Sequence, residues 1–197
     1  MAIARCMGSP LMSIESIVNQ AFDRIGYKRH LGNIWEGSVG ARIALNAWAE
    51  TRDALLVRTQ PEWARDDVAL EVLKTAPPWY DEQTPWDADL HPDLPWLYEY
   101  KQPDNCLVPL ALKPRPHTLP VWRPHPMRFR VKTDSSTYVL LGNDPAPILT
   151  CIVHTHDPDV WYEDFKEVMI VTLAKKFEVA LGHPTAKQEP KDADNAR

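Results

Sequence analysis

Nineteen prolines against seven glycines are the feature that most constrains how this 197-residue chain can fold. A proline donates no backbone hydrogen bond and restricts the residue before it, so closely spaced prolines interrupt helices and central strands. Between Pro77 and Pro126 prolines recur every few residues and are accompanied by four tryptophans: Trp79, Trp86, Trp96 and Trp122. Because these tryptophans carry too much apolar surface to stay in water, we predict an ordered, extended arm or loop that lies on a protein surface.

Two amphipathic helices are expected before this tract. Apolar residues recur at helical spacing from Ser13 to Ile25, with Ser13 placed to cap the first turn and Gly26 placed to end the helix. A second helix should begin at Ser38, another capping residue, and should end before Pro61. Because a linker of about a dozen residues joins the two helices, we expect them to pack as an antiparallel hairpin.

A third helix is expected after the tract. Asp157 and Pro158 are residue types preferred at the N-cap and at the first helical position, and Gly182 marks the end of the helix. The helical spacing of the apolar residues predicts a buried face on this helix. Its members are Trp161, Phe165, Val168, Met169, Thr172, Leu173 and Phe177.

The middle of the chain reads as short strands bounded by turn-forming residues. Val68, Leu70 and Val72 alternate with polar or small residues, which favours a strand there over a turn or two of helix. Five further strands are bounded by Pro, Gly, Asn or Asp and should form one small antiparallel sheet. They are Leu97–Tyr100, Leu107–Leu112, Arg128–Lys132, Thr137–Leu141 and Ile148–Thr155.

The predicted fold class is therefore α+β. A bundle of the two N-terminal helices and the C-terminal helix should accompany a small antiparallel sheet domain with extended loops rich in Pro and Trp. The expected divisions are an N-terminal helical hairpin at 1–62, a Pro- and Trp-rich β region at 63–156, a returning helix at 157–182 and an extended tail at 183–197. The tail has almost nothing apolar to pack, so we expect it to be disordered alone and to become ordered on a partner.

The charge distribution does not favour tight binding of nucleic acid by a single copy. The formal net charge is -5, and the lysines and arginines are scattered along the chain. Arg128, Arg130 and Lys132 alternate along one predicted strand and so share a face, which could contact DNA or an acidic partner. The first ten residues lack the apolar run of a signal peptide, so we expect no export, and we expect no membrane span.

No enzymatic centre is expected. His154 and His156 would share one face of a strand beside Asp157, a spacing that could place two imidazoles on a metal ion. We instead expect the histidines to end the strand in solvent and Asp157 to cap the helix, which leaves a metal-dependent hydrolase as the alternative. Cys106 and Cys151 should be small buried residues, and with Cys6 they fit free thiols better than disulfides. We expect no cofactor and no bound metal.

The order of the motifs resembles the head-to-tail adaptor proteins of short-tailed bacteriophages, the tail tubular protein A group. The order is two helices, then strands rich in Pro and Trp, then a helix opened by an Asp-Pro-x-x-Trp-x-x-x-Phe pattern. The resemblance covers roughly residues 13–182 and departs from the family at the long insertion Pro77–Pro126. The stretches that carry it are Ala21–Gly26, Glu36–Ser38 with Ala41, Thr51–Leu56, Trp63–Ala64, Tyr98–Tyr100, Pro103–Leu107 and Asp157–Phe165.

This resemblance implies a structural virion protein without catalytic residues. It implies a dodecameric ring in the neck between head and tail, bound to the portal protein on one side and to the tail nozzle or tail tube on the other. Double-stranded DNA would pass through the lumen during ejection without sequence-specific binding, and the chain would be made in the host cytoplasm. A tail-assembly chaperone that leaves the particle is a further alternative. The expected contacts with neighbouring subunits or partners are Trp79, Trp86, Trp96, Trp122, Lys187 and Arg197, although the tryptophans could also pack on their own domain.

Overall fold

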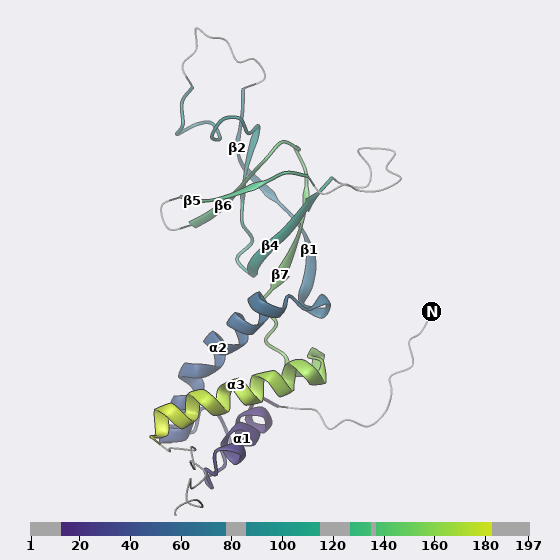
Figure 1. Cartoon of the computed structure of the whole chain (residues 1–197). Helices are drawn as coiled ribbons and strands as arrows, with labels where there is room; N and C mark the ends of the chain where they lie inside the picture. The colour runs from purple at the N-terminus through teal and green to yellow at the C-terminus, as the bar shows by residue number, and fades with distance from the viewer. Residues whose placement is uncertain (1–12, 78–85, 115–126, 135–136, 183–197) are drawn as a thin grey trace, which may run out of the picture. The chain divides into compact units, whose positions relative to one another are not determined.

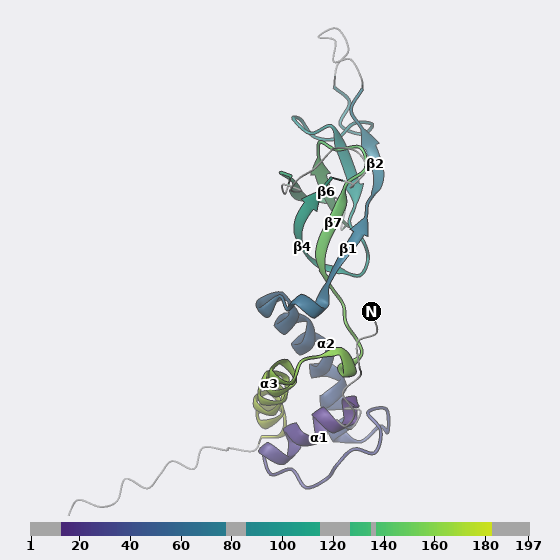
Figure 2. The same cartoon turned by 90° about the vertical axis from the view of Figure 1, so that its right-hand side faces the viewer.

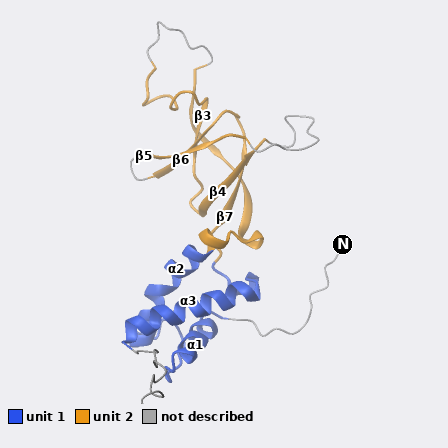
Figure 3. Cartoon of the chain, viewed as in Figure 1, with its two compact units in different colours: residues 1–55, 156–197 blue, residues 56–155 orange. Residues whose placement is uncertain are grey.

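The computed structural model describes residues 13–77, 86–114, 127–134 and 137–182 (Figure 1). Within these ranges the protein is α+β, with three α-helices and two small antiparallel sheets. The chain divides into two compact units (Figure 3). The helical unit comprises residues 1–55 and 156–197, and the β unit comprises residues 56–155. No helix of the described part is long and apolar enough to span a membrane.

The two N-terminal helices begin at the predicted capping residues. Helix α1 runs from Ile14 to Arg24, and the Ser13 hydroxyl accepts a hydrogen bond from the Ser16 N–H at 3.3 Å. Gly26 follows with a φ of 73°, the left-handed conformation that ends helices at low cost for glycine. Helix α2 covers Val39–Thr59, and Ser38 Oγ accepts from the Ala41 N–H at 3.2 Å. Local capping chemistry therefore fixes both starts.

Aromatic side chains from distant parts of the chain form the core of the helical unit. Helix α3, Glu163–Leu181, packs against α1 (Figure 2). The rings of Phe22 and Phe177 lie 4.7 Å apart between centroids. Trp48 of α2 stacks on Trp161 at 5.7 Å, and Phe165 meets Trp161 edge-on at 5.2 Å. Side chains from α3 and from the turn before it therefore complete this core.

The predicted start of the last helix is wrong by several residues. Asp157 caps a short 3-10 helix, Pro158–Val160, by accepting a hydrogen bond from the Asp159 N–H at 3.0 Å. Trp161 and Tyr162 then adopt extended backbone conformations, with ψ of 140° and 151°, so α3 begins only at Glu163. Burial of the Trp161 ring against Trp48 holds this break in place.

The buried face of α3 differs from the predicted one, because it also includes Lys166, Ile170 and Ala174. Phe165, Met169, Leu173 and Phe177 are buried at a spacing of four residues, as expected. Val168 is wrongly predicted as buried because it lies off this row and is 45% exposed. Thr172 is half-buried, and its hydroxyl donates to the Val168 carbonyl oxygen at 2.7 Å. The stop at Gly182 is confirmed, with a φ of 66°.

The β unit contains two sheets where the sequence predicted one. The first has the order β1 (Arg65–Ala69), β7 (Ile148–Val153), β4 (Cys106–Lys113). The second has the order β2 (Glu71–Thr75), β3 (Tyr98–Lys101), β6 (Thr137–Gly142), β5 (Arg130–Asp134). The strand predicted around Leu70 is split there, because the buried Leu70 separates β1 from β2 and the two halves join different sheets.

One cluster of buried side chains joins the two sheets. It consists of Leu70, Tyr100, Cys106, Leu112, Leu140, Leu149 and Cys151. A side chain at position 142 would crowd this cluster, because an added Cβ would lie 3.0 Å from Leu112 and 3.1 Å from Tyr100 and would push these side chains by a few tenths of an ångström. Burial also raises the pKa of the Tyr100 phenol, whose hydroxyl donates to the Asp144 carbonyl oxygen. The β unit therefore has a core of its own.

Candidate interaction surfaces

Of the tryptophans predicted as partner contacts, two lie in the described part of the chain. Trp86 and Trp96 are half-buried in the loop of residues 86–97 of the β unit. The Trp86 indole N–H donates to the Pro92 carbonyl oxygen at 3.0 Å, and its ring lies 5.3 Å from that of His91. The Trp96 backbone N–H donates to the Asp93 carbonyl oxygen at 3.0 Å. The other predicted contacts lie outside the described residues: Trp79, Trp122, Lys187 and Arg197.

Polar contacts fix this loop to strands of its own unit. Lys74 of β2 donates to the Ala88 carbonyl oxygen at 3.2 Å, and its ammonium group also lies 3.7 Å from the buried carboxylate of Glu99. Lys132 of β5 forms an ion pair of 2.9 Å with Asp93. Both visible tryptophans of the insertion therefore belong to a loop that is anchored on its own sheet.

The predicted basic face is only partly on one strand. Arg130 and Lys132 lie in β5 and pair with Leu141 and Val139, so they do share a face of that strand. Arg128 precedes the strand, which begins at Arg130. Arg128 and Arg130 are exposed, whereas Lys132 is half-buried and faces the Asp93 carboxylate. The cationic surface that remains for a partner is therefore centred on the two arginines.

The three residues of the possible metal cluster have structural contacts of different kinds. His154 belongs to the β unit, whereas His156 and Asp157 belong to the helical unit. His156 Nδ1 lies 2.7 Å from Nη1 of Arg52, a buried arginine of α2 that also pairs with Asp53 at 2.7 Å. Asp157 caps the following 3-10 helix. In the described ranges no three His, Cys, Asp or Glu side chains are grouped so that they could hold a metal ion.

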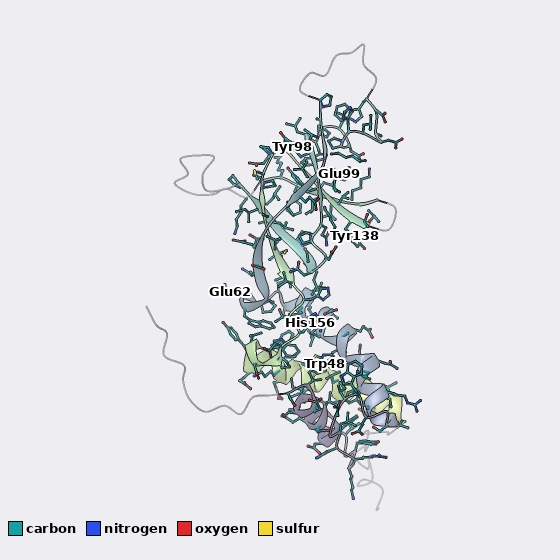
Figure 4. All side chains as sticks on the ribbon, turned by 180° about the vertical axis from the view of Figure 1, so that it is seen from behind. Trp48, Glu62, Tyr98, Glu99, Tyr138 and His156 are labelled. Carbon is teal, nitrogen blue, oxygen red and sulfur yellow. The ribbon has the colours of Figure 1, made fainter. Side chains whose placement is uncertain are left out.

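The Arg52 contact has a positioning role. Since an arginine side chain only donates hydrogen bonds, the His156 Nδ1 atom accepts, and its imidazole ties the segment after β7 to α2. The stack of Trp161 on Trp48, which is labelled in Figure 4, provides a second tie five residues after His156. The turn between these two attachments is therefore held firmly on the helical unit.

Cys106 and Cys151 are both buried, as predicted. Their thiols are close enough to interact, and a hydrogen bond to Cys151 together with burial raises the pKa of the Cys106 thiol. A thiol with a raised pKa forms little thiolate and is a poor nucleophile. The same hydrogen bond lowers the pKa of the Cys151 thiol, and both side chains are buried in the β core.

An aromatic residue that the sequence analysis did not select is the most exposed of the described large aromatic side chains. Trp35 lies in the linker between α1 and α2, and it is 76% exposed. Val39, at the start of α2, is 56% exposed, and Arg42 lies one helical turn further on. Arg29 is exposed in the same linker, and it adds to the hydrogen bond from Ser38 in lowering the pKa of the Glu36 carboxylate. We call Arg29, Trp35, Val39 and Arg42 the Trp35 surface.

The linker that carries Trp35 is held by its own polar side chains. Asn19 of α1 binds Leu31 twice, with its amide donating to the Leu31 carbonyl at 3.0 Å and its oxygen accepting from the Leu31 N–H at 2.8 Å. The Trp35 N–H donates to Asn33 Oδ1 at 2.8 Å. Hydrogen bonds from the Ser38 hydroxyl and from linker N–H groups hold the pKa of Glu36 below its usual range. Leu31 and Ile34 are buried, so the backbone that carries the exposed Trp35 indole is held in place.

A second exposed apolar surface has the opposite charge. The segment of residues 157–164 leaves Val160 48% exposed and Tyr162 60% exposed. It carries four carboxylates, all on exposed residues, of which that of Glu163 forms an ion pair of 2.8 Å with Lys166. We call this segment, with Asp157, Asp159, Val160, Tyr162, Glu163 and Asp164, the acidic turn.

The β unit has a hollow of about 430 Å³ where β3 ends. Leu73 and Tyr138 form apolar parts of its wall, and Lys101 with Asp104 forms a polar part at an ion-pair distance of 3.6 Å. Tyr138, labelled in Figure 4, is 58% exposed. The lining of the hollow is thus mixed, with apolar side chains beside an ion pair.

Sequence comparison adds no relationship to this picture. No known protein-family model matches the chain, and no curated protein matches it. The exposed surfaces and their chemistry are therefore the basis for a functional interpretation.

Proposed function

We propose that this chain is a structural subunit of a tailed bacteriophage that forms a dodecameric ring between the portal and the tail. In this proposal α1, α2 and α3 act as one bundle, and exposed side chains of the helical unit contact neighbouring subunits. The sequence resemblance over residues 13–182 suggests this role, and the α+β fold with helices at both ends of the described chain is consistent with it.

The observation that carries the proposal is the exposure of large apolar side chains on a well-packed unit. Trp35, Tyr162 and Val39 are each more than half exposed, although the helical unit buries other aromatic side chains completely. Contiguous exposed apolar surface rimmed by polar residues marks sites of protein–protein contact, and we propose that Trp35 and Val39 form one such surface. A protein that functions by assembling with other proteins uses such surfaces for contact and does not need a substrate.

The charge of the chain suits a ring through which DNA passes. Each bound phosphate would release counterions and increase affinity, so a strongly basic lining would retain the DNA. The formal net charge of -5 favours passage without retention. The exposed Arg128 and Arg130 are the described residues that we assign to transient contact with DNA or with an acidic partner protein.

Deleting the coding sequence from the phage tests this proposal. We expect DNA-filled heads that carry no tails, because the connection between portal and nozzle would be missing. Supplying the chain in trans should restore tailed, infectious particles. Normal particles from the deletion would contradict the proposal. Defective tails in a phage whose mature particle never contains the chain would instead indicate a tail-assembly chaperone.

A shorter deletion examines the C-terminal tail, for which we propose docking on the portal or on a neighbouring subunit. Removing residues 184–197 should leave the α3 core intact, since the helix ends at Leu181. We expect a folded chain that joins heads to tails poorly. Normal joining by the shortened chain would show that the tail has no part in assembly.

A further inference from the structure

The Trp35 surface and the acidic turn complement one another in charge. The segment of residues 27–42 has three exposed cations, Lys28, Arg29 and Arg42, and one exposed carboxylate, that of Glu36. His30, in the same segment, pairs with Asp23. The acidic turn has four exposed acidic residues. Each surface also has two exposed apolar side chains, Trp35 with Val39 and Val160 with Tyr162. The two surfaces thus match in both of the properties that favour association.

Each surface is fixed on a different helix of the helical unit. Asn19 of α1 holds Leu31 by two hydrogen bonds, and the Glu15 carboxylate accepts from the Ile34 N–H at 3.4 Å. The acidic turn is instead tied to α2 through Arg52 with His156 and through Trp48 with Trp161. Because each is pre-ordered, little conformational entropy is lost when either surface is covered. A single copy can therefore present both surfaces at the same time.

We propose that the Trp35 surface of one copy of this chain binds the acidic turn of the next copy. This inference rests on the proposed ring and identifies the contact that builds it. Pairing of two different surfaces is a head-to-tail contact, which gives closed rings or open filaments instead of symmetric dimers. We choose a second copy of this chain as the partner because its acidic turn complements the Trp35 surface in charge. The cationic side chains of the Trp35 surface are complementary to this turn even though the chain as a whole is acidic.

Truncation of one aromatic side chain on each surface tests the pairing. The full chain is examined by sedimentation velocity over a concentration series. We expect reversible self-association of the wild type, and at least a tenfold weakening by either Trp35→Ala or Tyr162→Ala. Tyr138→Ala removes a similarly exposed tyrosine from the β unit and should leave self-association unchanged. Circular dichroism and urea unfolding confirm that each variant is folded.

Mixing the two variants gives the result that is specific to a head-to-tail contact. The Trp35→Ala chain keeps its acidic turn, and the Tyr162→Ala chain keeps its Trp35 surface. A 1:1 mixture should therefore form dimers through the one intact pair and should stop there. Higher oligomers in the mixture, or no dimer, would overturn the inference.

Charge reversal gives an independent reading. Arg29→Glu and Asp159→Lys should each weaken self-association, because each places like charges in the contact. The double variant reverses both sides, so it should recover much of the wild-type association. Raising the salt concentration should weaken the self-association of the wild-type chain, because salt screens the attraction between exposed charges. The screening length is about 10 Å at 0.1 M salt and becomes shorter as salt is added. Lack of recovery in the double variant would overturn the pairing.

Failure of this inference is distinguishable from failure of the proposed function. A wild-type chain that stays monomeric at its highest soluble concentration, or that associates as strongly after Trp35→Ala, overturns the pairing. Neither result bears on whether the chain is part of the virion neck, because the protein composition of purified particles decides that question. A chain that is absent from particles but still pairs through these surfaces would overturn the phage role alone.

Discussion

The helical unit and the β unit bury their aromatic side chains in different ways. In the helical unit, Phe22 and Trp48 pack against Phe177 and Trp161, which come more than a hundred residues later in the chain. In the β unit, Tyr100 lies in a core of neighbouring strands, and the half-buried Trp86 and Trp96 belong to a loop that Lys74 and Lys132 fix to the sheet. Helix α3 therefore completes the core of the helical unit, whereas the β unit has a separate core.

The largest expected effect is the loss of Phe177, which is fully buried against Phe22. Phe177→Ala should destabilise the helical unit by about 3–5 kcal/mol through the lost burial and the cavity left behind. Hydrogen exchange should show faster opening in α1 and α3 and little change in β6 and β7. Val179→Ala on the exposed side of α3 is the control and should stay within about 0.5 kcal/mol of the wild type. Equal loss of protection in both units would break the comparison.

Gly142→Ala is the corresponding change in the β unit. The added Cβ would approach Leu112 at 3.0 Å and Tyr100 at 3.1 Å, so the core must shift to admit it. We expect a loss of about 1–3 kcal/mol, the usual range for overpacking. Gly32→Ala is a matched control, because its nearest neighbour would be a flexible Glu36 oxygen at 3.9 Å. Urea unfolding measures both, and a neutral Gly142→Ala would contradict the close packing at this site.

The comparison also bears on how much could be predicted from the sequence. The ends of the helices depend on local chemistry, and Ser13, Ser38 and Gly182 act at the predicted places. The start of α3 was misplaced because the stacking of Trp161 on Trp48, a contact between distant segments, holds two residues in extended conformations. Local signals could not reveal that contact.

The sheets and the candidate surfaces show the same limit. The alternation around Leu70 predicts a strand but cannot tell that its two halves pair with different partners, β7 and β3. The number of sheets follows from these distant pairings. Trp86 and Trp96 were predicted as partner contacts from composition, but whether a tryptophan is exposed depends on the packing of its neighbours. For the same reason Trp35 gave no signal beyond its presence in a polar linker.

A smaller effect is expected at the start of α2. Ser38→Ala removes the hydroxyl that accepts from the Ala41 N–H and should cost about 1 kcal/mol of stability. Ser38→Asp should retain part of the stability, because a carboxylate also caps a helix start although it loses the hydrogen bond to the Glu36 carboxylate. The change should appear in the helical unit alone when hydrogen exchange is followed in both units. An equal effect from Ala and Asp would show that the cap contributes little.

The smallest expected effect is a pH dependence in the β unit. The Thr150 hydroxyl and then the Lys113 ammonium hold the pKa of Asp67 below its ordinary value of 3.8. A lowered pKa in the folded state means that the ionised carboxylate stabilises the fold above that ordinary value and that this contribution is lost as pH falls through the folded-state pKa. Because the side chain is 55% exposed, we expect less than about 1 kcal/mol.

Asp67→Asn should flatten this acid dependence of the free energy of unfolding, measured between about pH 5 and pH 2. Thr150→Val removes the principal donor to the carboxylate and should flatten it as well. A wild-type chain whose β unit loses no more stability on acidification than these variants would refute the assignment.

Quantitative mass spectrometry of purified, mature phage particles tests the central claim most directly, because a connector must remain in the particle. The account predicts that the chain is present in the same copy number as the portal protein, as expected for two stacked rings of equal symmetry. Particles that are complete and infectious but contain no detectable copies of the chain would contradict it.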